Sequence, residues 1–164
     1  MNWKKEIDEM TQRRKFALGQ GGDQAVAKHH AKGRLTIRER IDKLIDQNTF
    51  EEIGPIAGAA NYDENGNLES FDPANFVLGF GKVSGRRIVV GGEDFTMRGG
   101  SPSPAGLRKS VYAEEIAIQY KLPLVRLHEG SGGSVGGTSG KGVSLPGPVN
   151  APARFKCVAQ AMST

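Results

Sequence analysis

The segment Arg98-Gly99-Gly100-Ser101 combines residue types that bind phosphate groups. Glycines let backbone amides approach a ligand closely, and the arginine adds a full positive charge. A helix is expected to begin shortly afterwards, at Ala105, and a helix N-terminus adds partial positive charge. A phosphate or pyrophosphate site is one interpretation of this pattern. A tight turn between a strand and a helix, with a solvated arginine, is the other.

A second glycine-rich segment, residues 130–142, follows a short apolar strand expected at residues 122–127. Ligands of open α/β sheets bind at the carboxyl ends of strands, where this segment begins. Its backbone N–H groups could stabilise a developing oxyanion without help from a side chain. A glycine loop without a ligand is the alternative interpretation. The spacing does not match the phosphate loop of nucleoside triphosphatases, so that class is not predicted.

Side chains that usually act as acids, bases or nucleophiles are few. His29 and His30 are expected on an exposed, polar helix rather than as ligands. His128 and Glu129 could form an acid–base pair, but adjacent strand residues point to opposite faces. Cys157 is the only cysteine, which excludes an internal disulfide and a thiolate metal cluster, and we expect it to be a core residue.

Composition and charge set the broad class of the protein. The 164 residues carry a net charge of +4 and include 23 glycines, about twice the share that is usual in a globular protein. No long basic run or interleaving of aromatic and basic residues predicts nucleic-acid binding. No apolar run is long enough to span a bilayer, and the first residues lack the apolar core of a signal peptide. These features favour a soluble protein of a reducing, cytoplasmic compartment.

The order of the expected elements predicts an α/β fold. Residues 1–48 are expected to form a helical segment, in which Thr36 and Glu39 have the spacing of a capping box. Residues 49–164 are expected to form a partial α/β domain, because a helix, a strand and a glycine-rich loop follow one another there. The expected elements are helices at 3–18, from 23, 36–45, 105–120 and 151–164, strands at 50–53, 75–83 and 83–92, and a surface turn at 63–67.

Four collinear blocks of this sequence resemble the carboxyltransferase (beta) subunits of biotin-dependent acyl-CoA carboxylases, such as propionyl-CoA and methylcrotonyl-CoA carboxylase. The resemblance runs from about residue 30 to the C-terminus. The blocks are Gly33-Arg34-Leu35-Thr36-Ile37-Arg38-Glu39-Arg40-Ile41-Asp42-Lys43-Leu44, Gly79-Phe80-Gly81-Lys82-Val83-Ser84-Gly85-Arg86, Asp94-Phe95-Thr96-Met97-Arg98-Gly99-Gly100-Ser101 and Ser131-Gly132-Gly133.

This resemblance implies a crotonase-type fold, a superhelix of ββα turns, of which the chain would hold the front part of the first of two domains. The family moves a carboxyl group from carboxybiotin, on a partner protein, to the α-carbon of an acyl-CoA. The reaction needs an enolate, which backbone amides in an oxyanion hole can stabilise. The resemblance therefore implies a fragment that is inactive alone. A CoA-binding or assembly module without catalysis is the alternative.

The resemblance also assigns roles to the two glycine-rich segments. The loop from Arg98 to Ser101 looks like the one that lies against CoA. Gly132, Gly133 and Ser134 look like the loop that offers the first oxyanion-hole amide, while the second amide would come from a later segment. The family usually has Asp-Ser-Gly-Gly-Ala where this chain has Glu129-Gly130-Ser131-Gly132-Gly133-Ser134. The alignment needs either a one-residue insertion or glycine in place of aspartate, so the resemblance defines the oxyanion residue only to within one or two positions. The implied partners are acyl-CoA, a biotin carboxylase or biotin carrier subunit, the remaining carboxyltransferase segment and further copies of the full-length chain, without a metal, nucleic acid or membrane.

Overall fold

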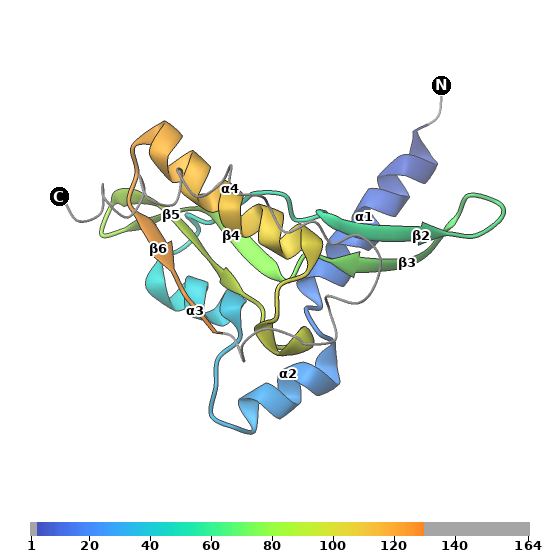
Figure 1. Ribbon diagram of the computed structural model, residues 1–164, viewed down its shortest axis with the longest axis horizontal. Coiled ribbons are helices and arrows are strands. Elements are labelled where there is room, and N and C mark those ends of the chain that lie inside the picture. Colours follow the sequence, from blue (N-terminus) through green and yellow to red (C-terminus); the bar gives the residue numbers. More distant parts are fainter. Residues whose placement is uncertain (1–2, 130–164) are drawn as a thin grey trace.

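The computed structural model describes residues 3–129, in which three helices precede the sheets (Figure 1). These are α1 (Lys4–Leu18), α2 (Asp23–His30) and α3 (Ile37–Leu44), at the positions that the sequence predicts. Helix α1 has no buried residue and lies along the two-stranded sheet. The Tyr62 hydroxyl of that sheet donates to the Glu9 carboxylate of α1 at 2.8 Å. A polar contact, rather than an apolar face, therefore holds α1 in place.

Helix α3 begins with the capping box that the sequence predicts. The Thr36 hydroxyl accepts from the Glu39 amide, and the Thr36 amide donates to the Glu39 carboxylate at 2.7 Å. His30 also contacts the Glu39 carboxylate, and these hydrogen bonds lower the pKa of Glu39, that from His30 most. The capping box gives hydrogen-bond partners to backbone amides at the N-terminus of this short helix, which would otherwise be unpaired. The cap fixes α3 with Ile37 and Ile41 against the sheet.

We expect Thr36→Ala to lower the free energy of unfolding by about 1 kcal/mol, because the side chain that caps α3 is lost. Thr36 is only 2% exposed, so water cannot easily replace its hydroxyl. Urea denaturation followed by circular dichroism measures the change. The same substitution at Thr11, whose hydroxyl donates to the Ile7 carbonyl on exposed α1, is the control and should have a smaller effect. Equal losses for the two variants would contradict the prediction.

The centre of the larger sheet is the antiparallel hairpin of β4 (Phe76–Val83) and β5 (Arg86–Glu93). Its two-residue turn has φ values of +50° at Ser84 and +78° at Gly85, as a type I′ hairpin turn requires. The Asp46 carboxylate accepts from both turn amides, at 3.0 and 2.8 Å. The hairpin predicted from the glycine turn is confirmed, and the segment after α3 secures it.

Two short strands complete this sheet, in the order β1-β4-β5-β6. Strand β1 (Glu51–Glu52) pairs antiparallel with β4, and β6 (Leu124–Arg126) pairs parallel with β5. Helix α4 (Pro104–Tyr120) connects β5 to β6, so the described chain contains one complete ββα turn followed by a parallel strand. The strand expected at residues 122–127 is present but shorter.

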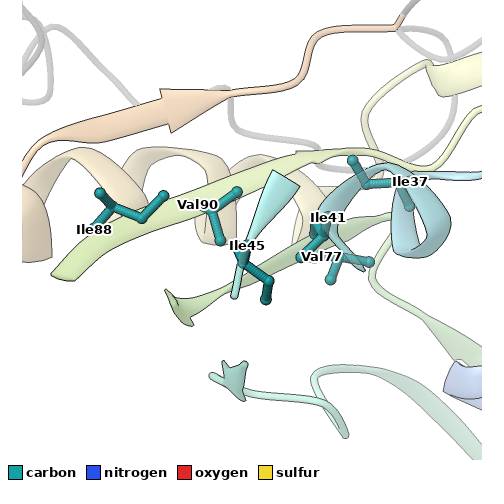
Figure 2. Close-up of a cluster of buried hydrophobic side chains, with 6 residues drawn as sticks. All are labelled: Ile37, Ile41, Ile45, Val77, Ile88 and Val90. Atoms are coloured by element: carbon teal, nitrogen blue, oxygen red, sulfur yellow. The ribbon is translucent and has the colours of Figure 1, made fainter. Parts of the chain in front are cut away.

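The larger sheet lies between α3 and α4, with a hydrophobic core on each face (Figure 1). Side chains alternate along β4 and β5, so each strand contributes to both cores. Figure 2 shows the core on the α3 side, which consists of Ile37, Ile41, Ile45, Val77, Ile88 and Val90. The core on the α4 side consists of Phe76, Leu78, Val89, Ala113, Ile116 and Ala117. Helix α3 thus packs as part of the same layered unit as the sheet.

A second sheet, β2 (Gly58–Tyr62) paired antiparallel with β3 (Leu68–Pro73), was not predicted. Only the turn between the strands was expected, and it is confirmed at residues 63–67. The Asp63 carboxylate accepts from the backbone amides of Asn65 and Asn67 there. The sequence does not predict these strands, because their mixed polar and small residues do not alternate with apolar ones.

Candidate functional site

The first candidate loop begins where β5 ends, with a buried turn at Asp94. Its carboxylate accepts from the Thr96 amide at 2.9 Å and from the Thr96 hydroxyl at 2.5 Å. The side chain is 3% exposed, and burial raises the pKa of Asp94, while the bonds from Thr96 oppose this shift. The Gly21 amide, between α1 and α2, donates to the Thr96 hydroxyl at 2.9 Å. The turn therefore joins the N-terminal helices to the loop that follows.

Residues Arg98–Gly100 form a tight turn with positive φ values at three consecutive positions, +53°, +59° and +75°. Only glycine adopts this region without steric cost, which explains the two glycines. The Gly100 amide donates to the Met97 carbonyl at 3.0 Å, and the Ser101 amide donates to the Arg98 carbonyl at 3.1 Å. The expectation that loop amides point toward a ligand is therefore not met by these two, because they close the turn itself.

The charge of the loop is accessible but paired. The Arg98 guanidinium donates to the Asp72 carboxylate of β3 at 2.6 Å, and about half of each side chain is exposed. An ion pair this exposed contributes between about 0 and 1 kcal/mol to stability. An anionic ligand could consequently replace Asp72 at little cost. Asp72 is a residue that the sequence analysis missed, since nothing in its position marks it as a partner of Arg98.

Asn75 is a second residue that the sequence analysis missed as part of the site. It directly precedes β4 and is 1% exposed. Its side-chain amide donates to the Ser101 carbonyl at 2.7 Å and accepts from the Ser103 amide at 2.9 Å. A polar residue at the start of an apolar strand gives no signal that it binds a loop 26 residues away.

The second candidate loop, with Gly132, Gly133 and Ser134, lies outside the described residues. The structure describes the chain that leads to it. After β6 the Leu127 amide donates to the Gly91 carbonyl at 2.9 Å, which continues the pairing with β5. The described chain that leads to this segment therefore runs along the carboxyl end of β5, where the first loop starts.

His128 and Glu129 do not form an acid–base pair. The His128 ring is two-thirds exposed, and its Nδ1 lies 3.3 Å from the Glu93 carboxylate. The Glu129 carboxylate is four-fifths buried and lies 3.4 Å from the Arg40 guanidinium and 3.7 Å from that of Arg34. Adjacent strand residues were expected to point to opposite faces, and this agrees with the structure, because the His128 ring and the Glu129 carboxylate contact different partners.

The prediction that both neighbouring histidines are exposed is wrong for His29. It is 5% exposed, with its Nε2 3.2 Å from the Leu35 carbonyl and its ring centroid 5.5 Å from that of Phe95. The reason is that α2 packs its last turn against the loop after β5. His30 on the same helix is exposed, as predicted, and binds Glu39 at 2.9 Å.

The described residues can thus bind an anion through Arg98, while the histidines pair with carboxylates other than the one predicted, His30 with Glu39 and His128 with Glu93. Within residues 3–129, no group of three or more His, Cys, Asp or Glu side chains is placed to hold a metal ion. The helices of this part of the chain are too short or too polar to cross a membrane.

Two solved structures have a fold similar to that of this chain. The computed structure matches transcarboxylase 12S with methylmalonyl-coenzyme A and methylmalonic acid bound (TM-score 0.69, 22% identity, 99% of this chain and 30% of that chain). It also matches a single-chain, multi-domain long-chain acyl-CoA carboxylase (TM-score 0.68, 29% identity, 94% of this chain and 16% of that chain). At 22% identity the first match shows the mixed α/β fold alone.

Sequence comparison identifies the family. Residues 28–146 match the Carboxyl transferase domain. A probable biotin-dependent acyl-coenzyme A carboxylase beta2 subunit of Mycobacterium tuberculosis is 34% identical over 143 residues, which cover 87% of this chain and 25% of the relative. The carboxyltransferase subunit of propionyl-CoA carboxylase from Haloferax mediterranei is 33% identical over 136 residues, 82% of this chain and 26% of the relative. The chain belongs to the carboxyltransferase family of biotin-dependent acyl-CoA carboxylases and spans about a quarter of the length of these relatives.

Proposed function

We propose that this chain forms the CoA side of an acyl-CoA carboxyltransferase, within the first of two crotonase-type domains. The observation that carries the proposal is the family match over residues 28–146, which includes the Arg98–Ser101 loop. The ββα turn of β4, β5 and α4 is compatible with such a fold. Arg98 is the residue of this loop that would bind a CoA phosphate, because its guanidinium is half-exposed and its present partner is a weakly held carboxylate.

The proposed reaction exchanges the α-proton of an acyl-CoA for the carboxyl group of carboxybiotin, so that the proton ends on the biotin nitrogen from which the carboxyl group leaves. Removing the α-proton leaves negative charge on the thioester oxygen, and backbone amides stabilise it there. We propose that Gly132, Gly133 and Ser134 supply the first of these amides, since they follow β6 in the sequence and the family match over residues 28–146 includes them. A later segment would supply the second, so we expect the isolated chain to be inactive.

Biotin, carried on a partner protein, would supply the carboxyl group as carboxybiotin. The relatives are named as subunits of biotin-dependent carboxylases, and a related structure is named as a hexamer assembly. The Arg98 cation suits a phosphate better than the uncharged ureido ring of biotin, so we assign Arg98 to CoA and not to biotin. The proposed partners are a biotin carboxylase or biotin carrier subunit, the remaining carboxyltransferase segment and further copies of the full-length chain, in the cytoplasm.

Calorimetry with propionyl-CoA tests the CoA site directly. We expect Arg98→Ala to weaken binding about tenfold, because a charge-assisted contact to a phosphate is lost. Arg86→Ala is the matched control, since Arg86 is exposed at the opposite end of β5 and should not contact the ligand. Equal affinities of the wild-type chain and the Arg98→Ala variant would refute the assignment of this loop to CoA.

A completed complex tests the catalytic part of the proposal. The chain would be combined with the remaining carboxyltransferase segment and a biotinylated partner, and carboxyl transfer from carboxybiotin to propionyl-CoA would be measured. Transfer that depends on this chain supports a catalytic role. Binding of propionyl-CoA without any transfer in the completed complex would instead support a CoA-binding or assembly module.

We expect Asp72→Asn to strengthen propionyl-CoA binding by about two- to fivefold. Asp72 holds the Arg98 guanidinium at 2.6 Å in the free chain and competes with a phosphate for it. The gain is small because the exposed pair is worth at most about 1 kcal/mol. Calorimetry at constant ionic strength measures the change, with Asp63→Asn on the neighbouring hairpin turn as the control for lost negative charge. Weaker binding by Asp72→Asn would contradict the prediction.

A further inference from the structure

Asn75 lies at the start of β4, and its buried side chain binds both ends of the span Ser101–Ser103, which follows the Arg98–Gly100 turn. Its Nδ2 donates to the Ser101 carbonyl at 2.7 Å, and its Oδ1 accepts from the Ser103 amide at 2.9 Å. Pro102 lies between them and has no N–H to donate. The Asn75 carbonyl also accepts from the Asp94 amide at 3.0 Å. One residue therefore fixes the loop at its beginning and near its end.

The roles of the two ends of this amide are fixed by its partners. A backbone carbonyl can only accept and a backbone N–H can only donate, so the Asn75 side chain must present its NH₂ to Ser101 and its oxygen to Ser103. An ionised carboxylate in its place would face the Ser101 carbonyl with no proton to share. A protonated carboxyl group would reproduce both hydrogen bonds, because it has one donor and one acceptor.

The same side chain determines how closely α4 approaches the sheet. Ser103 caps α4, since its hydroxyl accepts from the Gly106 amide at 3.0 Å. A Cβ atom at Gly106 would lie 2.3 Å from the Asn75 Oδ1, so only glycine permits this contact. The Asn75 amide thus holds the Ser101–Ser103 span and the first turn of α4 as one unit.

We propose that Asn75 is the positioning residue of the CoA loop, which sets the conformation of residues 98–103 before the ligand arrives. This inference rests on the proposed function for its ligand. A loop that is ordered in advance binds more tightly, because the ligand does not have to order it. The fixed span Ser101–Ser103 joins the turn that carries the Arg98 cation to the N-terminus of α4, and Asn75 orders it without touching the CoA itself.

The test measures the exchange of the Ser103 amide proton by NMR together with propionyl-CoA affinity by calorimetry. We expect Asn75→Ala to speed exchange at Ser103 at least tenfold and to weaken binding about tenfold. Asn75→Asp should do the same at pH 8 and recover most of both properties, relative to wild type at the same pH, near pH 5. Burial raises the pKa of a carboxyl group, and its protonated form reproduces the asparagine contacts. If the Asn75→Asp variant lost affinity through a structural change elsewhere, protonation of the new carboxyl group would not restore binding.

Two further variants keep the test decisive where Asn75→Ala does not fold. Gly106→Ala displaces the Asn75 amide from the helix side and should also speed Ser103 exchange and weaken binding. Ile41→Val, in the core on the far side of the sheet, should lower stability slightly without changing either readout. Unchanged exchange and affinity in the Asn75 and Gly106 variants would overturn the inference. If the wild-type chain does not bind propionyl-CoA, the proposed CoA site fails instead, and Ser103 exchange alone then decides whether Asn75 orders the loop.

Discussion

Replacing Phe76 by alanine should lower the free energy of unfolding by about 3–5 kcal/mol. Phe76 is 2% exposed and lies in the core between β4 and α4. Its ring also lies 5.0 Å from the Arg126 guanidinium of β6, which donates to the Ser110 hydroxyl of α4 at 3.0 Å. The substitution therefore leaves a cavity and removes the ring that supports a partly buried cation. We expect α4 and β6 to lose their fixed positions on the sheet before β4 and β5 separate.

Urea denaturation of the variants measures this effect. Phe76→Leu should cost less than Phe76→Ala, because it keeps most of the apolar volume. Phe16→Ala makes the same substitution on exposed α1, where the side chain is 44% exposed, and should change the free energy of unfolding by less than about 1 kcal/mol. A loss at Phe76 no larger than the loss at Phe16 would show that the core on the α4 side does not hold the unit together.

Replacing Lys109 by methionine should raise the free energy of unfolding at pH 7 by about 2 kcal/mol. Lys109 is 9% exposed, and its Nζ donates to the Gly54 carbonyl at 3.2 Å. Burial is the main cause that lowers the pKa of Lys109 to about 8; the charge of Glu52 opposes this shift, and that of Arg38 contributes to it. A shift from 10.5 to about 8 corresponds to about 3 kcal/mol, from which about 1 kcal/mol is subtracted for the lost hydrogen bond.

The pH dependence follows from the direction of that shift. Below pH 8 the amine is protonated in both states, so the folded protein bears the full cost of a buried charge. Between pH 8 and 10.5 the unfolded chain binds more protons than the folded one, so wild-type stability rises with pH as this cost disappears. The advantage of Lys109→Met should therefore be largest at or below pH 8 and vanish or reverse near pH 10.5.

Urea denaturation of the wild-type chain and of Lys109→Met at several pH values between 7 and 10.5 checks this prediction. The difference between the two proteins cancels the contributions of other titrating groups. Lys82→Met, at an exposed position on β4, serves as the matched control and should show little change with pH. A constant difference between wild type and Lys109→Met would mean that the amine is not desolvated in the folded state.

Local chemistry explains which parts of the fold the sequence predicted. The capping box of Thr36 and Glu39 and the hairpin turn at Gly85 depend on a few neighbouring residues, and both are confirmed. Strands β2 and β3 depend on their pairing with each other, which local pattern does not encode. The division at residue 48 stays a prediction, although α3 contributes Ile37 and Ile41 to a core shared with the sheet.

Residue types in the sequence predicted which residues form the candidate loop, but not which side chains contact that loop. Arg98, Gly99 and Gly100 were predicted because glycine and arginine have distinctive roles near phosphates; the positive φ values explain the glycines, and the CoA role stays a prediction. The side chains that hold this loop, Asp72 and Asn75, are common surface types far away in the sequence. Burial of His29 likewise depends on how α2 packs against Phe95, a tertiary contact with no sequence signature.

The arrangement of β6 at the edge of the sheet has a consequence for the order of folding. The hairpin of β4 and β5 closes through two residues, so little chain entropy opposes it. Strand β6 has three half-buried residues and can pair with β5 only after α4, which connects the two strands along the chain, has packed on the sheet. Non-local, parallel pairing of this kind forms late and is the first to come apart. Strand β6, which leads to residues 132–134 in the sequence, is thus expected to be the last part of the sheet to form. A ligand that binds only when β6 is paired with β5 would stabilise this pairing by mass action.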